Sequence, residues 1–328
     1  MSNSQNTFQL DRFDHYAVMG NPIAHSKSPL IHAVFAKQTN QILQYDAILV
    51  DTQEGEFAKA VQNFQTAGGK GLNITVPFKQ AAWVLAEQKT DRAECAGAVN
   101  TLLFDGQGRC IGENTDGIGL VHDLTQNHGC QINGQRVLIL GAGGAVRGLL
   151  RPLLELTNPA ECVIANRTVS KAENLARLFS NYGNISASSY GALSGQSYDL
   201  IINGTSASLQ GHSLPLPDNL VAEGGWCYDM MYANTATVFM QWAQQQEAAH
   251  VLDGLGMLVE QAAESFYLWR GIKPDTAPVI QQLREPVVNV DNTPKTSVSV
   301  QNIEIGGPQG QEHTRYGDWE RKGRCIDF

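Results

Sequence analysis

The stretch of sequence that decides the fold is VLILGAGGAVRG, from Val137 to Gly148. Apolar residues typical of a buried strand lead into a glycine-rich loop, and a helix-forming run follows. Glycines let the backbone turn tightly and approach a pyrophosphate, which the positive N-terminus of the helix stabilises. The sixth position is Val146, a departure from strict G-x-G-x-x-G, so a plain turn stays open beside nucleotide binding. The loop consists of Gly141, Ala142, Gly143, Gly144 and Ala145.

Strand-like and helical runs alternate on both sides of this loop. Downstream, the strand-like runs RVLIL, CVIAN and YDLIING alternate with the helical runs AVRGLLRPLLEL and SKAENLARLFS. Upstream, between Tyr16 and Phe104, the runs YAVM, YDAILV, LNITV and AVNTLLF alternate with SPLIHAVFAKQ, GEFAKAVQNFQ and FKQAAWVLAEQ. Such alternation is typical of mostly parallel sheets covered by helices.

These blocks predict an α/β protein with two lobes. We expect a mostly parallel α/β lobe over residues 1–116, completed by helices at about 255–285, and a Rossmann-type dinucleotide-binding lobe over 117–254. Residues 286–328 are rich in Thr, Ser, Gln, Gly and Pro and show no sustained period. We therefore expect a disordered, flexible tail there.

The composition excludes several classes of protein. The chain has 328 residues, of which 42% are hydrophobic, and a formal net charge of −9. An acidic surface without a basic patch repels nucleic acid and anionic membranes, so we expect neither as a partner. No run approaches the roughly 18 apolar residues of a membrane span, and no signal-peptide core is present, so we expect a cytoplasmic protein. The six cysteines are scattered without a C-x-x-C pair, which argues against a metal site.

The residues after the second strand of the nucleotide lobe decide between NAD and NADP. An NAD site usually carries Asp or Glu about 20 residues past the glycines, where it accepts from the ribose 2′-hydroxyl. This sequence has CVIANRT instead. An arginine favours a 2′-phosphate through charge-assisted hydrogen bonds, so we predict NADP, with a solvated surface arginine as the alternative. The residues concerned are Asn166, Arg167, Thr168 and Lys171.

Two hydroxyls precede a helix in SKSPLIH, where Ser26 and Ser28 are two residues apart and Pro29 suits the first turn. One interpretation is that Ser28 caps the helix, which contributes about 1 kcal/mol. The other is that both hydroxyls bind a polar ligand such as a carboxylate. The spacing does not separate these interpretations.

A lysine follows a strand and a proline in NITVPFKQ, and an aspartate opens a glycine-rich helix in GENTDGIGL. Pro77 suits a first helical turn, which places Lys79 where the helix dipole disfavours a cation. In a cleft such a lysine is suited to proton transfer, and the alternative is a solvated surface lysine. Asp116 falls at the junction of the predicted lobes, where a carboxylate either caps a helix or faces a cleft. Spacing alone does not place it beside Lys79.

Taken together, these motifs resemble the shikimate dehydrogenase family over roughly residues 14–285. The motifs recur in family order and are GNPIAHSKSP, GLNITVPFK, AGAVNTL, GENTDGIG, LGAGGA, ANRT, NGTSAS, YDMMY and DGLGMLVEQAAESFYLW. The resemblance implies an oxidoreductase that reduces 3-dehydroshikimate to shikimate with NADPH, in the pathway to chorismate and the aromatic amino acids. A similar family, the quinate/shikimate dehydrogenases, commonly has an acidic residue after the second strand for NAD, and ANRT argues against it.

The resemblance also implies roles for particular residues. It makes Lys79 the proton donor to the developing alkoxide and Asp116 its orienting partner, without a metal. It implies that the substrate site consists of Ser26, Ser28, Thr75, Lys79, Asn100, Asp116, Tyr232 and Gln261. The two serines would hold the carboxylate, and Asn100 and Gln261 the ring hydroxyls. It implies that NADP contacts the Gly141–Ala145 loop, the segment Asn166–Lys171, Met230 and Gly254, and Asp91.

The end of the chain resembles a second family. The segment IEIGGPQGQEHTRYGDWERKGRCIDF, mainly Gly306 to Phe328, is similar to the type 4 succinate dehydrogenase assembly factor, although Ile326 departs from the small polar residue expected there. That resemblance implies binding to the flavoprotein subunit of succinate dehydrogenase, with Trp319 as an anchor. The alternative is an inert remnant of a gene fusion. Monomers and homodimers both fit the sequence.

Overall fold

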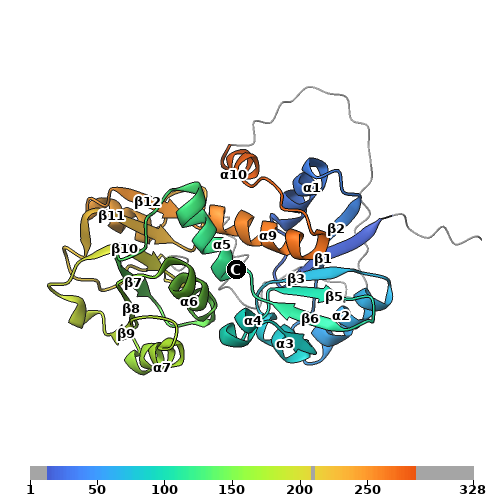
Figure 1. Cartoon of the computed structure of the whole chain (residues 1–328), viewed down its shortest axis with the longest axis horizontal. Coiled ribbons are helices and arrows are strands. Elements are labelled where there is room, and N and C mark those ends of the chain that lie inside the picture. The colour runs from blue at the N-terminus through green and yellow to red at the C-terminus, as the bar shows by residue number, and fades with distance from the viewer. Residues whose placement is uncertain (1–12, 208–210, 286–328) are drawn as a thin grey trace, which may run out of the picture.

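The computed structural model describes residues 13–207 and 211–285. Within them the chain forms two lobes, each built on a six-stranded sheet, and Figure 1 shows the two sheets side by side with α5 and α9 between them. No helix among the described residues is both long and apolar enough to cross a lipid bilayer. The predicted tail, including Trp319 and Ile326, lies outside the described residues.

The first lobe has a mixed sheet with the order β2-β1-β3-β5-β6-β4. β1 runs parallel to both β2 and β3, and β4 runs parallel to β6, whereas β5 is antiparallel to β3 and β6. The strands are β1 (Asp14–Gly20), β2 (Leu43–Leu49), β3 (Gly71–Ile74), β4 (Gln88–Lys89), β5 (Thr101–Phe104) and β6 (Cys110–Glu113). The helices are α1 (Ser28–Gln38), α2 (Glu56–Thr66), α3 (Lys79–Leu85) and α4 (Asp91–Ala96).

The second lobe has a fully parallel sheet with the order β12-β11-β10-β7-β8-β9. If these six strands are numbered 1 to 6 along the chain and the sheet is read from β9 to β12, their order is 3-2-1-4-5-6. This is the doubly wound order of dinucleotide-binding folds, which confirms the predicted Rossmann-type architecture. The strands are β7 (Arg136–Leu140), β8 (Glu161–Ala165), β9 (Ile185–Ser188), β10 (Tyr198–Asn203), β11 (Val221–Asp229) and β12 (His250–Asp253). The helices are α6 (Gly144–Thr157), α7 (Val169–Phe179), the 3₁₀ turn η2 (Gly191–Leu193) and α8 (Val238–Gln245).

Two helical segments connect the lobes. The helix α5 (Asp116–His122) continues into one turn of π-helix, η1 (Asp123–Asn127), and packs against α6 of the second lobe. The helix α9 (Leu255–Arg270) packs against α5 and also against α1 and β5 of the first lobe, and α10 (Ala277–Arg284) follows it. α5 therefore packs on the second lobe, α9 packs on the first lobe, and the contact between the two helices joins the lobes.

One apolar core runs through these connections. It joins Phe35 of α1, Leu120 of α5, Leu149 of α6 and Phe266 of α9, all of which are fully buried. Burial of each such side chain contributes roughly 1.5–3 kcal/mol. Each lobe also has a smaller apolar core, which covers the face of its sheet that points away from the shared core. The shared core fixes the positions of α5 and α9, and the polar residues described next project from these two helices and from the first sheet.

Candidate active site

A buried ion pair joins the first residues of two helices. Lys79 opens α3 and Asp116 opens α5, and 2.7 Å separate Lys79 Nζ from Asp116 Oδ2. The side chains are 14% and 5% exposed, so Lys79 is not a solvated surface lysine. The carbonyl of Lys79 accepts from the N–H of Val99 at 2.9 Å, which fastens the start of α3 to the loop that precedes β5. Charge-assisted hydrogen bonds of this kind are short and strong.

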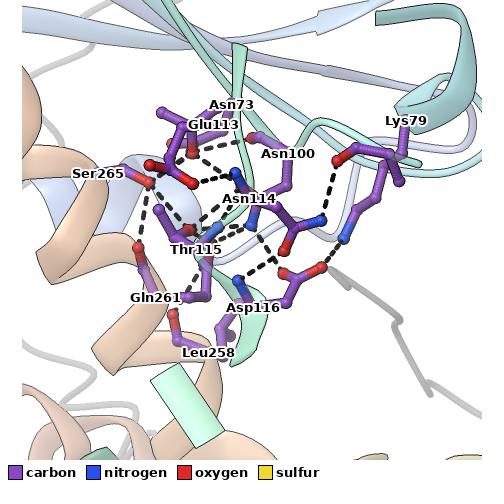
Figure 2. Close-up of polar contacts among 12 residues, drawn as sticks. Asn73, Lys79, Asn100, Glu113, Asn114, Thr115, Asp116, Leu258, Gln261 and Ser265 are labelled. Atoms are coloured by element: carbon purple, nitrogen blue, oxygen red, sulfur yellow. Dashed lines mark hydrogen bonds and ion pairs between the residues drawn. The ribbon is translucent and has the colours of Figure 1, made fainter. Parts of the chain in front are cut away.

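Asn100 holds the second oxygen of the aspartate. Its amide nitrogen Nδ2 donates to Asp116 Oδ1 at 2.7 Å and lies 2.9 Å from Thr115 Oγ1 and 3.3 Å from Gln261 Oε1. Its amide oxygen accepts from the N–H of Thr115 at 2.9 Å. Figure 2 shows Lys79 and Asn100 reaching the carboxylate of Asp116, with Gln261 on the side away from Lys79. Both oxygens of Asp116 are therefore held by hydrogen bonds.

A second group of polar side chains supports Asn100 from the sheet. Asn73 on β3 and Thr101 on β5 are directly opposite each other, and Asn73 Nδ2 donates to Thr101 Oγ1 at 3.2 Å and to Ser265 Oγ at 3.0 Å. Ser265 Oγ in turn donates to the carbonyl of Gln261 at 3.0 Å. This group therefore connects the sheet of the first lobe to α9.

Sequence reasoning did not include Asn73, Thr115 or Ser265 among the site residues. Ser265 follows Gln261 by four residues, and residues at this spacing lie on the same face of a helix, so the spacing was a usable signal. Asn73 stands between Leu72 and Ile74, which are buried in the apolar core, so alternation placed it on the opposite face of the strand.

An ionic cluster surrounds the end of β6, the strand that precedes Asp116 in the chain. Glu113, at the end of β6, is 4% exposed and accepts from Arg92 Nε at 3.1 Å and Nη2 at 2.9 Å. Arg92 Nη2 also lies 3.3 Å from Glu264 on α9. The same Glu113 accepts from the backbone N–H of Asn114 at 2.7 Å. The cluster thus fastens the strand end that leads into Asp116 to α4 and α9.

The remaining predicted substrate residues lie at strand and helix ends. Ser28 is buried as the first residue of α1, and its N–H donates to Ser26 Oγ at 3.3 Å. Ser28 therefore does not cap the helix, because the capping position belongs to Lys27, whose side chain forms no capping hydrogen bond. Thr75 is buried directly after β3, and Tyr232 is buried shortly after β11.

The glycine loop has the geometry that a pyrophosphate site requires. Gly141 has a φ of +108°, and a Cβ there would lie 3.2 Å from the carbonyl oxygen of Gly204. Around Gly143 and Gly144 a Cβ would meet nothing within 4 Å, so the space beside these residues is open. Gly144 begins α6, a fourteen-residue helix whose first turn carries no side-chain cap. The loop therefore fits a phosphate group at a helix N-terminus.

The other predicted cofactor residues occupy three places. Asn166 to Lys171 follow β8, where Arg167 is exposed at the carboxyl end of the sheet and Asn166 Nδ2 donates to the carbonyl of Thr168 at 2.9 Å. Met230 directly follows β11 and is buried, and the N–H of Gly254 donates to the neighbouring Met231 carbonyl at 3.1 Å. Asp91 opens α4, is 85% exposed and lies 3.5 Å from Arg151 of α6. Among the described residues, no group of three or more His, Cys, Asp or Glu is placed to hold a metal ion.

The fold and site define a class of protein: a two-lobed nicotinamide-dependent dehydrogenase, with a Rossmann-type lobe linked to a lobe that carries a buried lysine–carboxylate pair. Over 271 residues the chain is 59% identical to the shikimate dehydrogenase (NADP(+)) of Cellvibrio japonicus, a match that covers 83% of this chain and 97% of that relative. The chain belongs to the shikimate dehydrogenase family. The predicted resemblance of residues 14–285 to this family, and the predicted two-lobed α/β fold, are thereby confirmed.

Family models and solved structures agree with this assignment. The model described as shikimate dehydrogenase substrate binding domain matches residues 18–102, shikimate / quinate 5-dehydrogenase matches 123–210, and shikimate 5'-dehydrogenase C-terminal domain matches 254–284. An Ael1 enzyme from Pseudomonas putida superposes with a TM-score of 0.79 at 48% identity, covering 83% of this chain and 99% of that one. Shikimate 5-dehydrogenase from Thermus thermophilus, solved with NADP(H) and shikimate, gives 0.73 at 30% identity, with the same coverage.

The end of the chain has a separate match. A family described only as a protein of unknown function matches residues 290–328, all of which lie outside the described residues. The resemblance of this segment to a succinate dehydrogenase assembly factor therefore stays a prediction.

Proposed function

We propose that this chain is an NADP-dependent shikimate dehydrogenase that reduces 3-dehydroshikimate to shikimate in the pathway to chorismate and the aromatic amino acids. The observation that carries the proposal is the buried pair of Lys79 and Asp116, 2.7 Å apart, in a chain 59% identical to an NADP-dependent shikimate dehydrogenase. The proposal places the reaction in the cytoplasm, which fractionation of expressing cells tests. It holds for a monomer and for a homodimer, which light scattering of the purified chain distinguishes.

The proposed chemistry assigns the proton to Lys79. Bound NADPH supplies the hydride that reduces the ketone carbon. The substrate oxygen gains negative charge as this happens, and Lys79 Nζ stabilises that charge and delivers a proton to the oxygen. Asp116 accepts from Lys79 and so fixes the direction of the ammonium group. In the reverse direction, Lys79 accepts the proton from the shikimate hydroxyl.

The proposed substrate site extends from this pair. Asn100 and Gln261 already contact each other at 3.3 Å beside Asp116, and we assign them to the ring hydroxyls. Ser26 and Ser28, at the start of α1, are assigned to the substrate carboxylate, which the positive end of the helix favours. Thr75, four residues before Lys79, and Tyr232, after β11, complete the proposed site.

The proposed cofactor site follows the carboxyl ends of the second sheet. The loop from Gly141 to Ala145 is assigned to the pyrophosphate, and its open glycines support this assignment. Arg167 and Lys171 are assigned to the 2′-phosphate, with Asn166 and Thr168 shaping the turn that presents them. Met230 and Gly254 are assigned to the nicotinamide end. Asp91 is the outermost proposed contact, because its side chain is exposed at the contact between α4 and α6.

The test is the absorbance of reduced nicotinamide with the purified chain. Shikimate and quinate are each combined with NADP and with NAD. We expect rapid formation of NADPH with shikimate and NADP, and much slower reduction in the other three mixtures. Faster turnover with quinate and NAD would overturn the assignment in favour of a quinate/shikimate dehydrogenase. If a folded chain that binds NADP forms no reduced nicotinamide in any of the four mixtures, the proposed activity itself is overturned.

We propose a second, separable function for residues 286–328: binding to the flavoprotein subunit of succinate dehydrogenase. The support is the sequence resemblance of Gly306–Phe328, in particular the run from Arg315 to Glu320. We expect the full chain to retain that subunit in a pull-down, and both a chain ending at residue 285 and Trp319→Ala to lose it. Equal retention by all three chains, or none by the full chain, would leave the inert remnant as the explanation.

A further inference from the structure

A second buried polar pair lies away from Lys79 and Asp116. Tyr228 of β11 donates its hydroxyl to Asp123 Oδ2 at 2.7 Å, and the two residues are 105 positions apart in the sequence. Both side chains belong to fully buried residues. A carboxylate without solvent needs several donors. The other oxygen of Asp123, Oδ1, accepts from Asn127 Nδ2 at 2.9 Å and lies 3.6 Å from His128 Nε2. The proposed mechanism assigns no role to this pair.

The position of Asp123 in the chain relates it to the site. Asp116 is the first residue of α5, and Asp123 immediately follows its last residue. Seven residues of helix span roughly 10 Å, so the two aspartates mark opposite ends of one rigid element. Asp123 also begins the turn of π-helix, a feature often found at functional positions. Fixing Asp123 therefore fixes the direction of the helix that carries Asp116.

The position of Tyr228 relates the pair to the cofactor. Tyr228 precedes Met230 by two residues on the same strand end, and Met230 is one of the residues proposed to contact the nicotinamide. Burial, and then the charge of Asp123, raise the pKa of Tyr228 well above its ordinary value of 10. The phenol therefore stays protonated and donates to Asp123 throughout the working pH range.

The first turn of α9 rests against the same carboxylate. A Cβ added to Gly256 would lie 1.9 Å from Asp123 Oδ1, so only glycine fits at this point. Gly254, which precedes α9, is a proposed nicotinamide contact, and Gln261 further along α9 belongs to the polar network around Asp116. Asn127 extends the contact, because it also donates to Glu260 at 2.9 Å. Asp123 thus lies where α5, β11 and α9 meet.

We propose that Asp123 and Tyr228 are positioning residues that set the distance between the bound nicotinamide and the substrate carbon. They do so by holding α5, which carries Asp116, against the strand end that carries Met230 and the helix start that follows Gly254. Hydride transfer requires the reacting atoms about 3–3.5 Å apart, and a displacement near 1 Å costs about 100-fold in rate. This inference rests on the proposed function.

The test compares Tyr228→Phe with the wild-type enzyme. The substitution removes one hydroxyl and leaves the ring in the core. We expect kcat to fall by about 10-fold, with the KM for shikimate within about twofold, because the hydride donor is displaced while the substrate contacts stay. In the reverse direction, the reduction of 3-dehydroshikimate by NADPH deuterated at the transferred position, we expect a larger isotope effect on kcat than in the wild type, since hydride transfer becomes more rate-limiting. Thermal unfolding reports how far the fold itself is weakened.

Two further variants make the outcome decisive. Gly256→Ala, which pushes on Asp123 from α9, should change the isotope effect in the same direction. Tyr198→Phe is the control, because Tyr198 is also buried in this sheet but its ring contacts Arg136 at 5.0 Å instead of Asp123. An unchanged kcat in Tyr228→Phe would overturn the inference, and so would a lower kcat with an unchanged isotope effect, which marks a loss of folded enzyme only. An inactive wild type would instead refute the proposed function.

Discussion

Lys79 and Asp116 meet as the first residues of two different helices, with 2.7 Å between Lys79 Nζ and Asp116 Oδ2. The two positions are electrostatically unequal, because a helix N-terminus stabilises a carboxylate and destabilises a cation. Asp116 is therefore favoured by its own helix and compensates for the unfavourable place of Lys79. The lysine is directed by this carboxylate, and Asn100 in turn directs the carboxylate.

The first prediction concerns this pair. In Asp116→Asn the amide oxygen still accepts from Asn100, which turns the amide NH₂ toward the ammonium of Lys79. We expect kcat for shikimate oxidation to fall by about 10²- to 10⁴-fold, the usual size of a lost general acid–base contribution. The kcat of Lys79→Ala should fall by a similar factor. The kcat of the double variant should fall by little more than that of either single variant, because the two residues act as a unit. Steady-state kinetics on the three purified chains measures this.

A matched control for the pair is Asp105→Asn. Asp105 forms an ion pair with Arg109 at 2.7 Å, but in an exposed turn between β5 and β6. We expect its kcat to stay within twofold of the wild type. Near-normal turnover in Lys79→Ala would show that another group delivers the proton.

The second prediction concerns the choice of dinucleotide. Arg167 is exposed at the carboxyl end of β8, and a charge-assisted contact to a 2′-phosphate contributes about 1.5–3 kcal/mol. Arg167→Ala should therefore raise the KM for NADP by about 10- to 100-fold and leave the KM for NAD nearly unchanged. Arg177→Ala is the control, because Arg177 lies in the last turn of α7, the helix that follows Arg167. This substitution should change neither the KM for NADP nor the KM for NAD. An equal loss for both dinucleotides in Arg167→Ala would contradict a 2′-phosphate contact.

The third prediction concerns stability at the ionic cluster. Arg92→Ala leaves the buried carboxylate of Glu113 without its bidentate partner. Removal of one member of a buried pair costs about 3–5 kcal/mol, and partial exposure of Arg92 places the expected loss near the lower end. The midpoint of urea unfolding should shift accordingly. Arg109→Ala, which breaks an exposed pair, should shift the midpoint far less, and equal shifts would refute the distinction.

Local signals predict the second lobe well. The strand, glycine loop and helix from Val137 to Gly148 are contiguous, and parallel strands joined by helices leave little freedom of order. The strand directions of the first lobe are harder to predict, because β5 pairs antiparallel with β3 and the two strands are separated by 26 residues that contain two helices and a short strand. Nothing in the runs LNITV and AVNTLLF specifies that direction. The sheet order of this lobe therefore follows only from the structure.

The active site, too, could be predicted only in part from the sequence. Lys79 and Asp116 are 37 residues apart, and the pairing depends on how α3 and α5 both return to the region of Asn100. Spacing identified each residue as a candidate but not as a partner of the other, and only resemblance to a family supplied the pairing. The contact between Asp123 and Tyr228 had no local signal either, because it depends on the packing of α5 against the second lobe.

A buried histidine beside the polar network gives the fold a predictable response to acid. His32 of α1 is 1% exposed and stacks on Tyr45, with ring centroids 4.1 Å apart and planes 7° apart. Burial lowers the pKa of His32 to about 3, against a smaller opposing effect of the Asn73 side chain. In the unfolded chain the ordinary pKa is about 6.5. Between these values the unfolded state binds one more proton than the folded state, so the free energy of unfolding falls as the pH falls.

The fourth prediction is that His32→Phe removes this response. One proton contributes about 1.4 kcal/mol per pH unit below 6.5, so between pH 8 and pH 5 the wild type should lose about 2 kcal/mol more stability than the variant. Urea unfolding at pH 5, 6, 7 and 8 measures the difference. Phe35→Leu is the control, because Phe35 contacts the same ring and its loss should lower stability equally at every pH. If wild type and His32→Phe lose stability in parallel, His32 already carries a proton when folded or is not the titrating group.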